Sequence, residues 1–198
     1  MDKLKIFHTY YPPLHTEVTE TKLKTNNSVS LNMLGYRFIY KNSHANSGRV
    51  GIYVKQGIFF LLKMIINNPL VEDIWIDAKL NGSNSSTVVT VIYFHPHLSH
   101  QTFQDELESQ LENLDLSSKK VFIIDFNINL FQKSQSVVNY LRSLTTLGFV
   151  SLIDCPTHFM LNLTPSLLDH IYTNQHKKIH CGTIAFPISD HHPTYALL

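Results

Sequence analysis

The sequence of 198 residues has only two cysteines, almost no net charge and no long apolar run. Cys155 and Cys181 are too few for a disulfide framework or a cysteine-ligated zinc cluster. Sixteen Lys and Arg against fifteen Asp and Glu give a net charge of +1. A global basic field, which marks many nucleic-acid-binding proteins, is therefore excluded, and such a partner would have to be recognised at a local site.

The most apolar stretch is too short to cross a bilayer. Residues 57–66 read GIFFLLKMII and are interrupted by Lys63, whereas a membrane-spanning helix needs about 20 apolar residues. We therefore expect this stretch to lie in the protein core and expect no membrane partner. The opening MDKLKIFHTYYPPLH lacks the apolar segment of a secretory signal. We expect a protein that is not secreted and that resides in the nucleus or the cytoplasm.

What is present is the composition of one globular domain, 43% hydrophobic and 16% charged, with no internal repeat. Strand-like runs alternate with segments of helical spacing, which predicts an α/β sandwich with two mixed sheets packed face to face and helices outside. We treat residues 1–198 as a single domain. Expected strands are 50–55, 74–80, 87–93, 119–126, 149–153, 168–172 and 191–198, with a hairpin turn at 81–86. Expected helices are 102–114, with a start signal at Thr102, and 137–147, stopped by Gly148.

The residues that could do chemistry lie where expected strands end. In VFIIDFNINL an apolar run gives way to Asp125 and Asn127, which a period of two places on one face. A carboxylate and an amide at the end of a buried strand are costly unless they are used or paired. An Asx turn after the strand explains the same two residues without any function.

Two Asp-His doublets strengthen this pattern. One doublet alone means little, because histidine is often a core or surface residue. Two of them, combined with carboxylate, amide and phenol groups, suit Mg²⁺-assisted phosphoester cleavage. The whole set consists of Glu20, Tyr93, Asp125, Asn127, Asp169 with His170, and Asp190 with His191.

A series of motifs runs from Val18 to the end of the chain: TETKL, LGYRFIYKN with GRVGIYVK, EDIWIDAKL, VIYFHP, KKVFIIDFNINL, CPTHF, SLLDHIYTN and ISDHHP. In this order the motifs resemble those of the endonuclease/exonuclease/phosphatase superfamily, most closely the apurinic-type endonuclease domain of non-LTR retrotransposons. The resemblance implies a DNase I-like fold, a Mg²⁺ cofactor with Mn²⁺ as the alternative, and DNA as partner. It leaves the oligomeric state open.

The resemblance also implies roles for the residues that would bind the metal ion and for those that would position the attacking water. Glu20 is similar to the carboxylate that binds the catalytic Mg²⁺, and Asp190 is similar to the carboxylate opposite it. Asp125 resembles the residue that orients or deprotonates the attacking water. Asn127 beside it would position water and phosphate.

The remaining roles concern the phosphate. His191 resembles the imidazole that contacts the scissile phosphate and stabilises its charge, held in place by a carboxylate that here would be Asp169. Tyr93 is similar to a phosphate-contacting phenol. His170 follows Asp169 in a strand-like run and so should point away from it as a packing residue.

The sequence departs from the family pattern at several places. Ile124 stands where the family has a glycine before the Asp, and Phe94 and His95 replace an Arg-Pro pair after the Tyr. Only nineteen residues precede Glu20, whereas a strand, crossover helix and strand need about 30. The family's first strand, with its active-site Asn, and its first helix cannot therefore all be present, so the domain is expected to be N-terminally truncated.

Three functions stay open at this point. The first is a Mg²⁺-dependent DNA-nicking endonuclease of retrotransposon origin, and the second is an inactive remnant or binding module of that domain. The third is another phosphoesterase of the superfamily, acting on lipid or inositol phosphates. Separately, the histidines of HPHLSH, which are His95, His97 and His100, could bind Zn²⁺ or Ni²⁺, although a plain loop explains them better.

Overall fold

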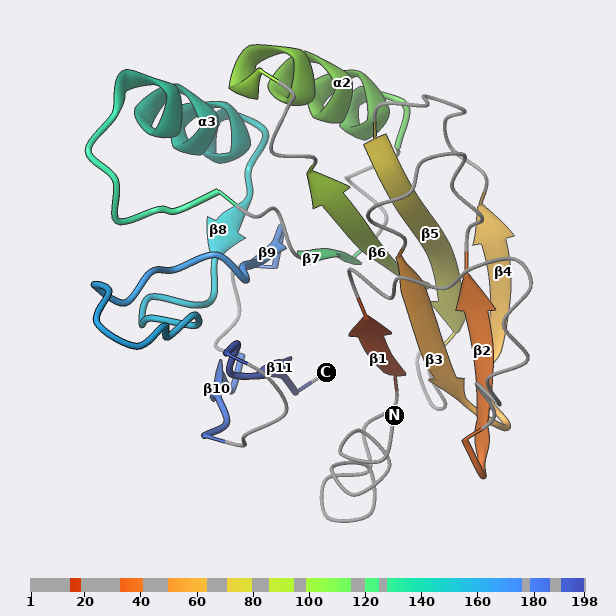
Figure 1. Cartoon of the computed structure of the whole chain (residues 1–198). Helices are drawn as coiled ribbons and strands as arrows, with labels where there is room; N and C mark the ends of the chain where they lie inside the picture. The colour runs from red at the N-terminus through yellow and green to blue at the C-terminus, as the bar shows by residue number, and fades with distance from the viewer. Residues whose placement is uncertain are drawn as a thin grey trace, which may run out of the picture.

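The computed structural model describes residues 15–18, 33–40, 50–63, 71–79, 86–94, 99–114, 120–124, 128–175, 179–185 and 190–197. These residues form a layered α/β sandwich with two described helices on one side of a large sheet (Figure 1). The predicted fold class is confirmed.

The larger sheet has six strands in the order β4-β5-β6-β7-β9-β8. Strands β6 and β7 pair in parallel, whereas the other pairs of this sheet are antiparallel, so the sheet is mixed as predicted. Its β5–β6 pair is the expected hairpin, whose turn residues 81–85 lie outside the described residues. The strands are β4 (Phe59–Lys63), β5 (Val71–Lys79), β6 (Thr87–Phe94), β7 (Lys120–Ile124), β8 (Val150–Ser151) and β9 (Ile171–Thr173).

Two smaller sheets complete the described strands. In the three-stranded sheet, β3 (Gly51–Lys55) pairs antiparallel with both β1 (His15–Val18) and β2 (Tyr36–Tyr40). Near the end of the chain, β10 (Cys181–Thr183) pairs antiparallel with β11 (Thr194–Ala196). The expected strands 149–153 and 191–198 are therefore shorter than predicted.

The central strands bury side chains on both faces. On one face, Ile52 and Val54 of β3 pack with Ile76 of β5 and Val91 of β6, which joins the small sheet to the large one. On the opposite face, Trp75 lies in the cluster that the helices cover. A strand enclosed in this way needs apolar residues at odd and even positions, which is why β6 reads TVVTVIYF rather than alternating.

Each helix begins at a capping serine. Helix α2 (His100–Glu112) has Ser99 as its N-cap, and the Ser99 hydroxyl accepts a hydrogen bond of 3.0 Å from the Thr102 backbone N–H. The start signal predicted at Thr102 was wrong. Ser99, three residues earlier, caps the helix instead and accepts the hydrogen bond from the Thr102 N–H. Helix α3 (Gln135–Thr146) is capped by Ser134 and is followed by Gly148 at a φ of 82°, which supplies the predicted stop.

The cap can be tested by a single substitution. Replacing Ser99 by Ala should lower the free energy of unfolding by about 1 kcal/mol, because the Thr102 N–H loses its acceptor. Urea denaturation followed by circular dichroism measures the change. Replacing Ser109, an exposed residue inside the same helix, by Ala is the control and should not destabilise the protein.

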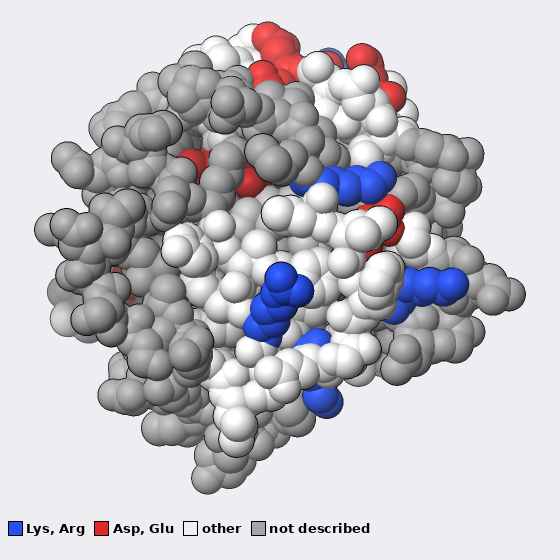
Figure 2. Space-filling model, turned by 90° about the vertical axis from the view of Figure 1, so that its right-hand side faces the viewer, with Lys and Arg blue, Asp and Glu red and all other residues white. Residues whose placement is uncertain are grey.

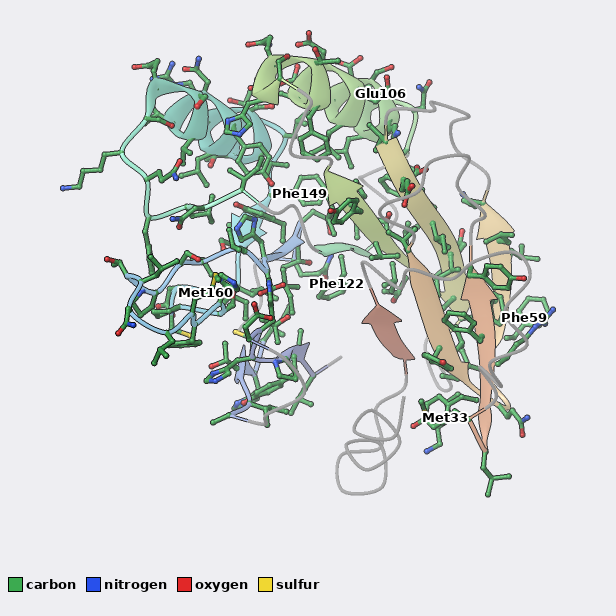
Figure 3. The ribbon with its side chains drawn as sticks, in the orientation of Figure 1. Met33, Phe59, Glu106, Phe122, Phe149 and Met160 are labelled. Carbon is green, nitrogen blue, oxygen red and sulfur yellow. The ribbon has the colours of Figure 1, made fainter. Side chains whose placement is uncertain are left out.

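For the described residues 57–63, strand β4 corrects the expectation that the stretch 57–66 lies in the core. Phe59, Leu61 and Leu62 are 67%, 58% and 53% exposed. The reason is that β4 is one of the two edge strands of the six-stranded sheet. Phe59 points outward in Figure 3, and Figure 2 looks onto this side, where uncharged side chains dominate the described surface. None of the described helices is long and apolar enough to cross a membrane.

Candidate active site

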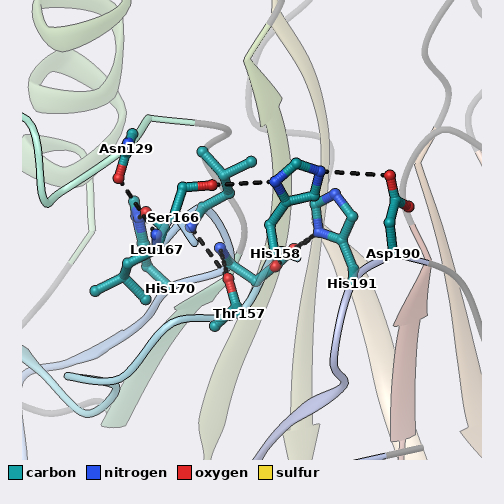
Figure 4. A network of polar contacts seen from close by, with 10 residues as sticks. Asn129, Thr157, His158, Ser166, Leu167, His170, Asp190 and His191 are labelled. Carbon is teal, nitrogen blue, oxygen red and sulfur yellow. Dashed lines mark hydrogen bonds and ion pairs between the residues drawn. The ribbon is translucent and has the colours of Figure 1, made fainter. Parts of the chain in front are cut away.

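The polar side chains of the candidate site lie on two loop segments that run side by side (Figure 4). One segment, with His158, precedes β9, and the other, with His191, precedes β11. The Phe159 N–H donates to the Asp190 carbonyl at 2.8 Å, and the His192 N–H donates to the Thr157 carbonyl at 2.7 Å. These bonds form an antiparallel bridge between His158 and His191. Residues about 30 positions apart in the sequence thus face one another.

Thr157 fixes the geometry of this loop pair. It is fully buried, and its hydroxyl oxygen accepts the N–H groups of Leu168 at 3.1 Å and Asp169 at 3.0 Å. Its own N–H donates to the Ser166 carbonyl at 2.9 Å. One side chain therefore holds the backbone that presents Asp169, a role that the sequence did not reveal.

Asp169 and His191 form the closest ion pair of this region. Nδ1 of His191 lies 2.8 Å and 3.0 Å from the two carboxylate oxygens of Asp169. Their side chains are 19% and 38% exposed, so the pair is partly shielded but reachable from solvent. A carboxylate on Nδ1 fixes the orientation of the imidazole ring.

His158 is a site residue that sequence reasoning missed. Its Nδ1 lies 3.1 Å from Ser166 Oγ, its Nε2 lies 3.4 Å from an Asp190 carboxylate oxygen, and its ring centroid is 4.6 Å from that of His191. The sequence signal for it is the motif CPTHF, which by itself assigns no role to His158. A single histidine in an irregular loop has no periodicity that would predict this pairing.

Tyr93 lies near the end of β6, where it is 6% exposed and packs in the apolar cluster between the two sheets. It is the register partner of Glu72 in β5. Its contact with phosphate stays a prediction.

Three predicted site residues, Glu20, Asp125 and Asn127, lie outside the described residues. Strand β1 ends at Val18, two residues before Glu20, and β7 ends at Ile124, directly before Asp125. Their roles stay predictions.

His170 is the packing residue that the sequence predicted. It is fully buried, and its Nε2–H donates to the Leu167 carbonyl at 3.1 Å. It precedes β9 rather than lying inside a strand. Burial lowers the pKa of this imidazole from 6.5 to about 4, because the charged form loses its hydration, against smaller opposing effects of the Leu167 carbonyl and Asp169.

This shift predicts acid sensitivity of the fold. Between pH 6.5 and pH 4 the unfolded chain binds a proton at His170 that the folded chain does not, so stability falls as the pH falls through this window. Between pH 7.5 and pH 5 the loss from this group should be about 2 kcal/mol. Urea unfolding at both pH values measures it. His170→Gln should remove this part of the pH dependence, whereas the same change at exposed His180 should leave it.

The architecture and the comparisons define one class of fold. No protein-family model and no curated protein matches the sequence. Solved structures match over nearly the whole chain, and the chain shares their DNase I-like α/β fold.

The particular structures can be named. The endonuclease domain of TRAS1, a telomere-specific non-LTR retrotransposon, has 10% identity and a TM-score of 0.74, with 98% of this chain and 89% of that chain covered. TDP2 of D. rerio, complexed with a single-strand DNA product, has 12% identity, a TM-score of 0.72 and coverages of 98% and 89%. An endonuclease/exonuclease/phosphatase family protein from Leptotrichia buccalis has 13% identity, a TM-score of 0.69 and coverages of 100% and 91%.

Proposed function

We propose that this protein is a Mg²⁺-dependent phosphodiester hydrolase that nicks DNA and derives from a retrotransposon. The observation that carries the proposal is the Asp169–His191 pair beside Asp190, on a fold shared with nucleases. A carboxylate-held imidazole beside a second carboxylate suits a reaction in which negative charge builds on phosphate oxygens.

His191 is the group that acts on the phosphate in this proposal. Its Nε2–H, directed by Asp169 on the other ring nitrogen, donates a hydrogen bond to a non-bridging phosphate oxygen. The Asp169 carboxylate stabilises the imidazolium, so the positive charge is present when the phosphate gains negative charge. Asp125 orients or deprotonates the attacking water, Asn127 positions it, and Tyr93 contacts the phosphate.

The donor set of Asp190 and Glu20 fits Mg²⁺, which prefers carboxylate oxygens and keeps several waters. Asp190 is half exposed and able to accept a hydrated ion, and Glu20 would supply the second carboxylate. When bound, Mg²⁺ supplies charge neutralisation at the phosphate and leaving oxygens. Mn²⁺ has similar oxygen preferences and is the alternative.

DNA is the proposed substrate because of the proteins that share the fold. TRAS1 contributes an endonuclease domain, and the D. rerio TDP2 structure holds a single-strand DNA product. The near-neutral chain offers no global basic field, so DNA affinity should depend on the local site and on loop shape.

Nicking of supercoiled plasmid by the purified chain tests the function. With Mg²⁺ the supercoiled form should convert to the open circle, and both EDTA and Asp125→Ala should abolish the conversion. Circular dichroism must show that the variant is folded. A folded, unmodified protein that does not nick contradicts the enzyme proposal and leaves an inactive remnant or binding module.

A parallel assay distinguishes DNA nicking from the third function, that of a phosphoesterase acting on lipid or inositol phosphates. Under the same conditions, phosphate release from a phosphoinositide should be absent if DNA is the substrate. Turnover of the phosphoinositide without plasmid nicking would replace the DNA proposal by a lipid or inositol phosphatase.

A further inference from the structure

His158, Asp190 and His191 bring two imidazoles and one carboxylate together. One ligand atom from each lies within 4.8 Å of those of the other two. The three side chains come from two segments that the backbone bonds of Thr157 and Phe159 hold side by side (Figure 4). The cluster therefore rests on paired backbone rather than on one flexible loop.

Each imidazole is held by its Nδ1 atom. His191 Nδ1 contacts Asp169, and His158 Nδ1 lies 3.1 Å from Ser166 Oγ. A histidine whose Nδ1–H donates to an oxygen presents its Nε2 lone pair, which is the arrangement found around metal-bound histidines. Both rings are thus oriented through Nδ1 within the cluster that they form with Asp190.

The spacing supports a small ion with nitrogen ligands. His158 Nε2 lies 3.4 Å from the Asp190 carboxylate oxygen, which is long for a charge-assisted hydrogen bond of about 2.8 Å. Bonds of about 2.0–2.1 Å in a tetrahedron separate two ligand atoms by about 3.3 Å. The distance between His158 and Asp190 matches such an edge, and the ligand atom of His191 lies within 4.8 Å of both.

We propose that His158, Asp190 and His191 form a binding site for a transition-metal ion of the Zn²⁺ class, with water in the fourth position. Imidazole nitrogens favour such ions over Mg²⁺, which prefers oxygen ligands. The side chains of Asp190 and His191 are 52% and 38% exposed, so an ion can enter from solvent. His158, which has no part in the proposed nuclease mechanism, gives this site its second nitrogen.

Occupation of the site has a consequence that rests on the proposed function. The bound ion would take Asp190 from Mg²⁺ and the Nε2 atom of His191 from the phosphate. Zn²⁺ should therefore inhibit nicking at a fixed Mg²⁺ concentration, and His158→Ala should relieve this inhibition.

Binding itself is tested without any activity assay. The purified, tag-free full chain is titrated with Co²⁺, whose visible absorption reports tetrahedral nitrogen and oxygen ligation, and Zn²⁺ is then added as competitor. One equivalent should bind. His158→Ala and the milder His158→Gln should each weaken binding at least about tenfold. Circular dichroism checks the fold of each variant.

Two control variants locate the ion. His192→Ala changes the residue next to His191, whose ring packs on Phe159 rather than in the cluster, and should leave binding unchanged. His97→Ala should also leave it unchanged. Absence of Co²⁺ binding, binding that survives in folded His158 variants, or loss of binding in His97→Ala would each overturn the proposal. None of these outcomes depends on whether the chain nicks DNA.

Discussion

Replacing His191 by Ala should lower plasmid nicking at least about 100-fold, while the protein stays folded. The physical reason is that the imidazole held by Asp169 at 2.8 Å supplies the positive hydrogen-bond donor for the phosphate in the proposed mechanism. Removing one such preorganised donor typically costs a factor of about 10²–10³ in rate. Single-turnover nicking at pH 7 with saturating Mg²⁺ measures the loss.

The neighbouring histidine provides the control for this prediction. His192 packs its ring on Phe159 at a centroid distance of 4.3 Å, and His192→Ala should nick at close to the rate of the unmodified chain. Equal losses in both variants would mean that disruption of the loop, rather than the His191 imidazole, lowers the rate. A His191→Ala rate within about threefold of the unmodified chain would contradict the assigned role.

The second large effect, a loss of both stability and nicking, is expected when Thr157 is replaced. Replacing it by the isosteric Val removes the oxygen that accepts the N–H groups of Leu168 and Asp169. Each backbone N–H that loses its acceptor costs about 1–3 kcal/mol, so with two such groups the free energy of unfolding should fall by about 2–6 kcal/mol. Nicking should also fall at least about tenfold, because Asp169 loses its fixed position.

Urea denaturation and the nicking assay test the two parts of this prediction separately. Thr145→Val is the matched control, since Thr145 is exposed and its hydroxyl donates to the Leu141 carbonyl within α3. It should change stability by less than about 0.5 kcal/mol. A similarly small effect of Thr157→Val would show that this threonine does not hold the loop.

The sequence predicted the regular elements well where one physical signal dominates. The β-branched run of β6 and the apolar spacing of α2 left few alternatives, and Gly148 ended α3 as expected. The apolar stretch around Phe59 and Leu61 was misassigned to the core, because hydrophobicity alone does not say whether a strand becomes the edge of its sheet.

The candidate site was only partly predictable. The two doublets pointed to Asp169, Asp190 and His191, and the structure brings these residues into one region. His158 and Thr157 could not be found in the same way, because their importance comes from backbone pairing between segments far apart in the chain. Irregular loops carry no periodic signal for such pairing.

The most direct test of the central claim is the single-turnover nicking rate of Asp169→Asn relative to the unmodified chain. The substitution keeps the size of the side chain but removes the negative charge that faces Nδ1 of His191 at 2.8 Å. We expect a folded protein whose rate at neutral pH is lower by at least about 100-fold, since the comparable change in a catalytic triad costs about 10⁴. An unchanged rate in the folded variant would contradict the account, because the Asp169–His191 pair would then have no part in phosphodiester cleavage.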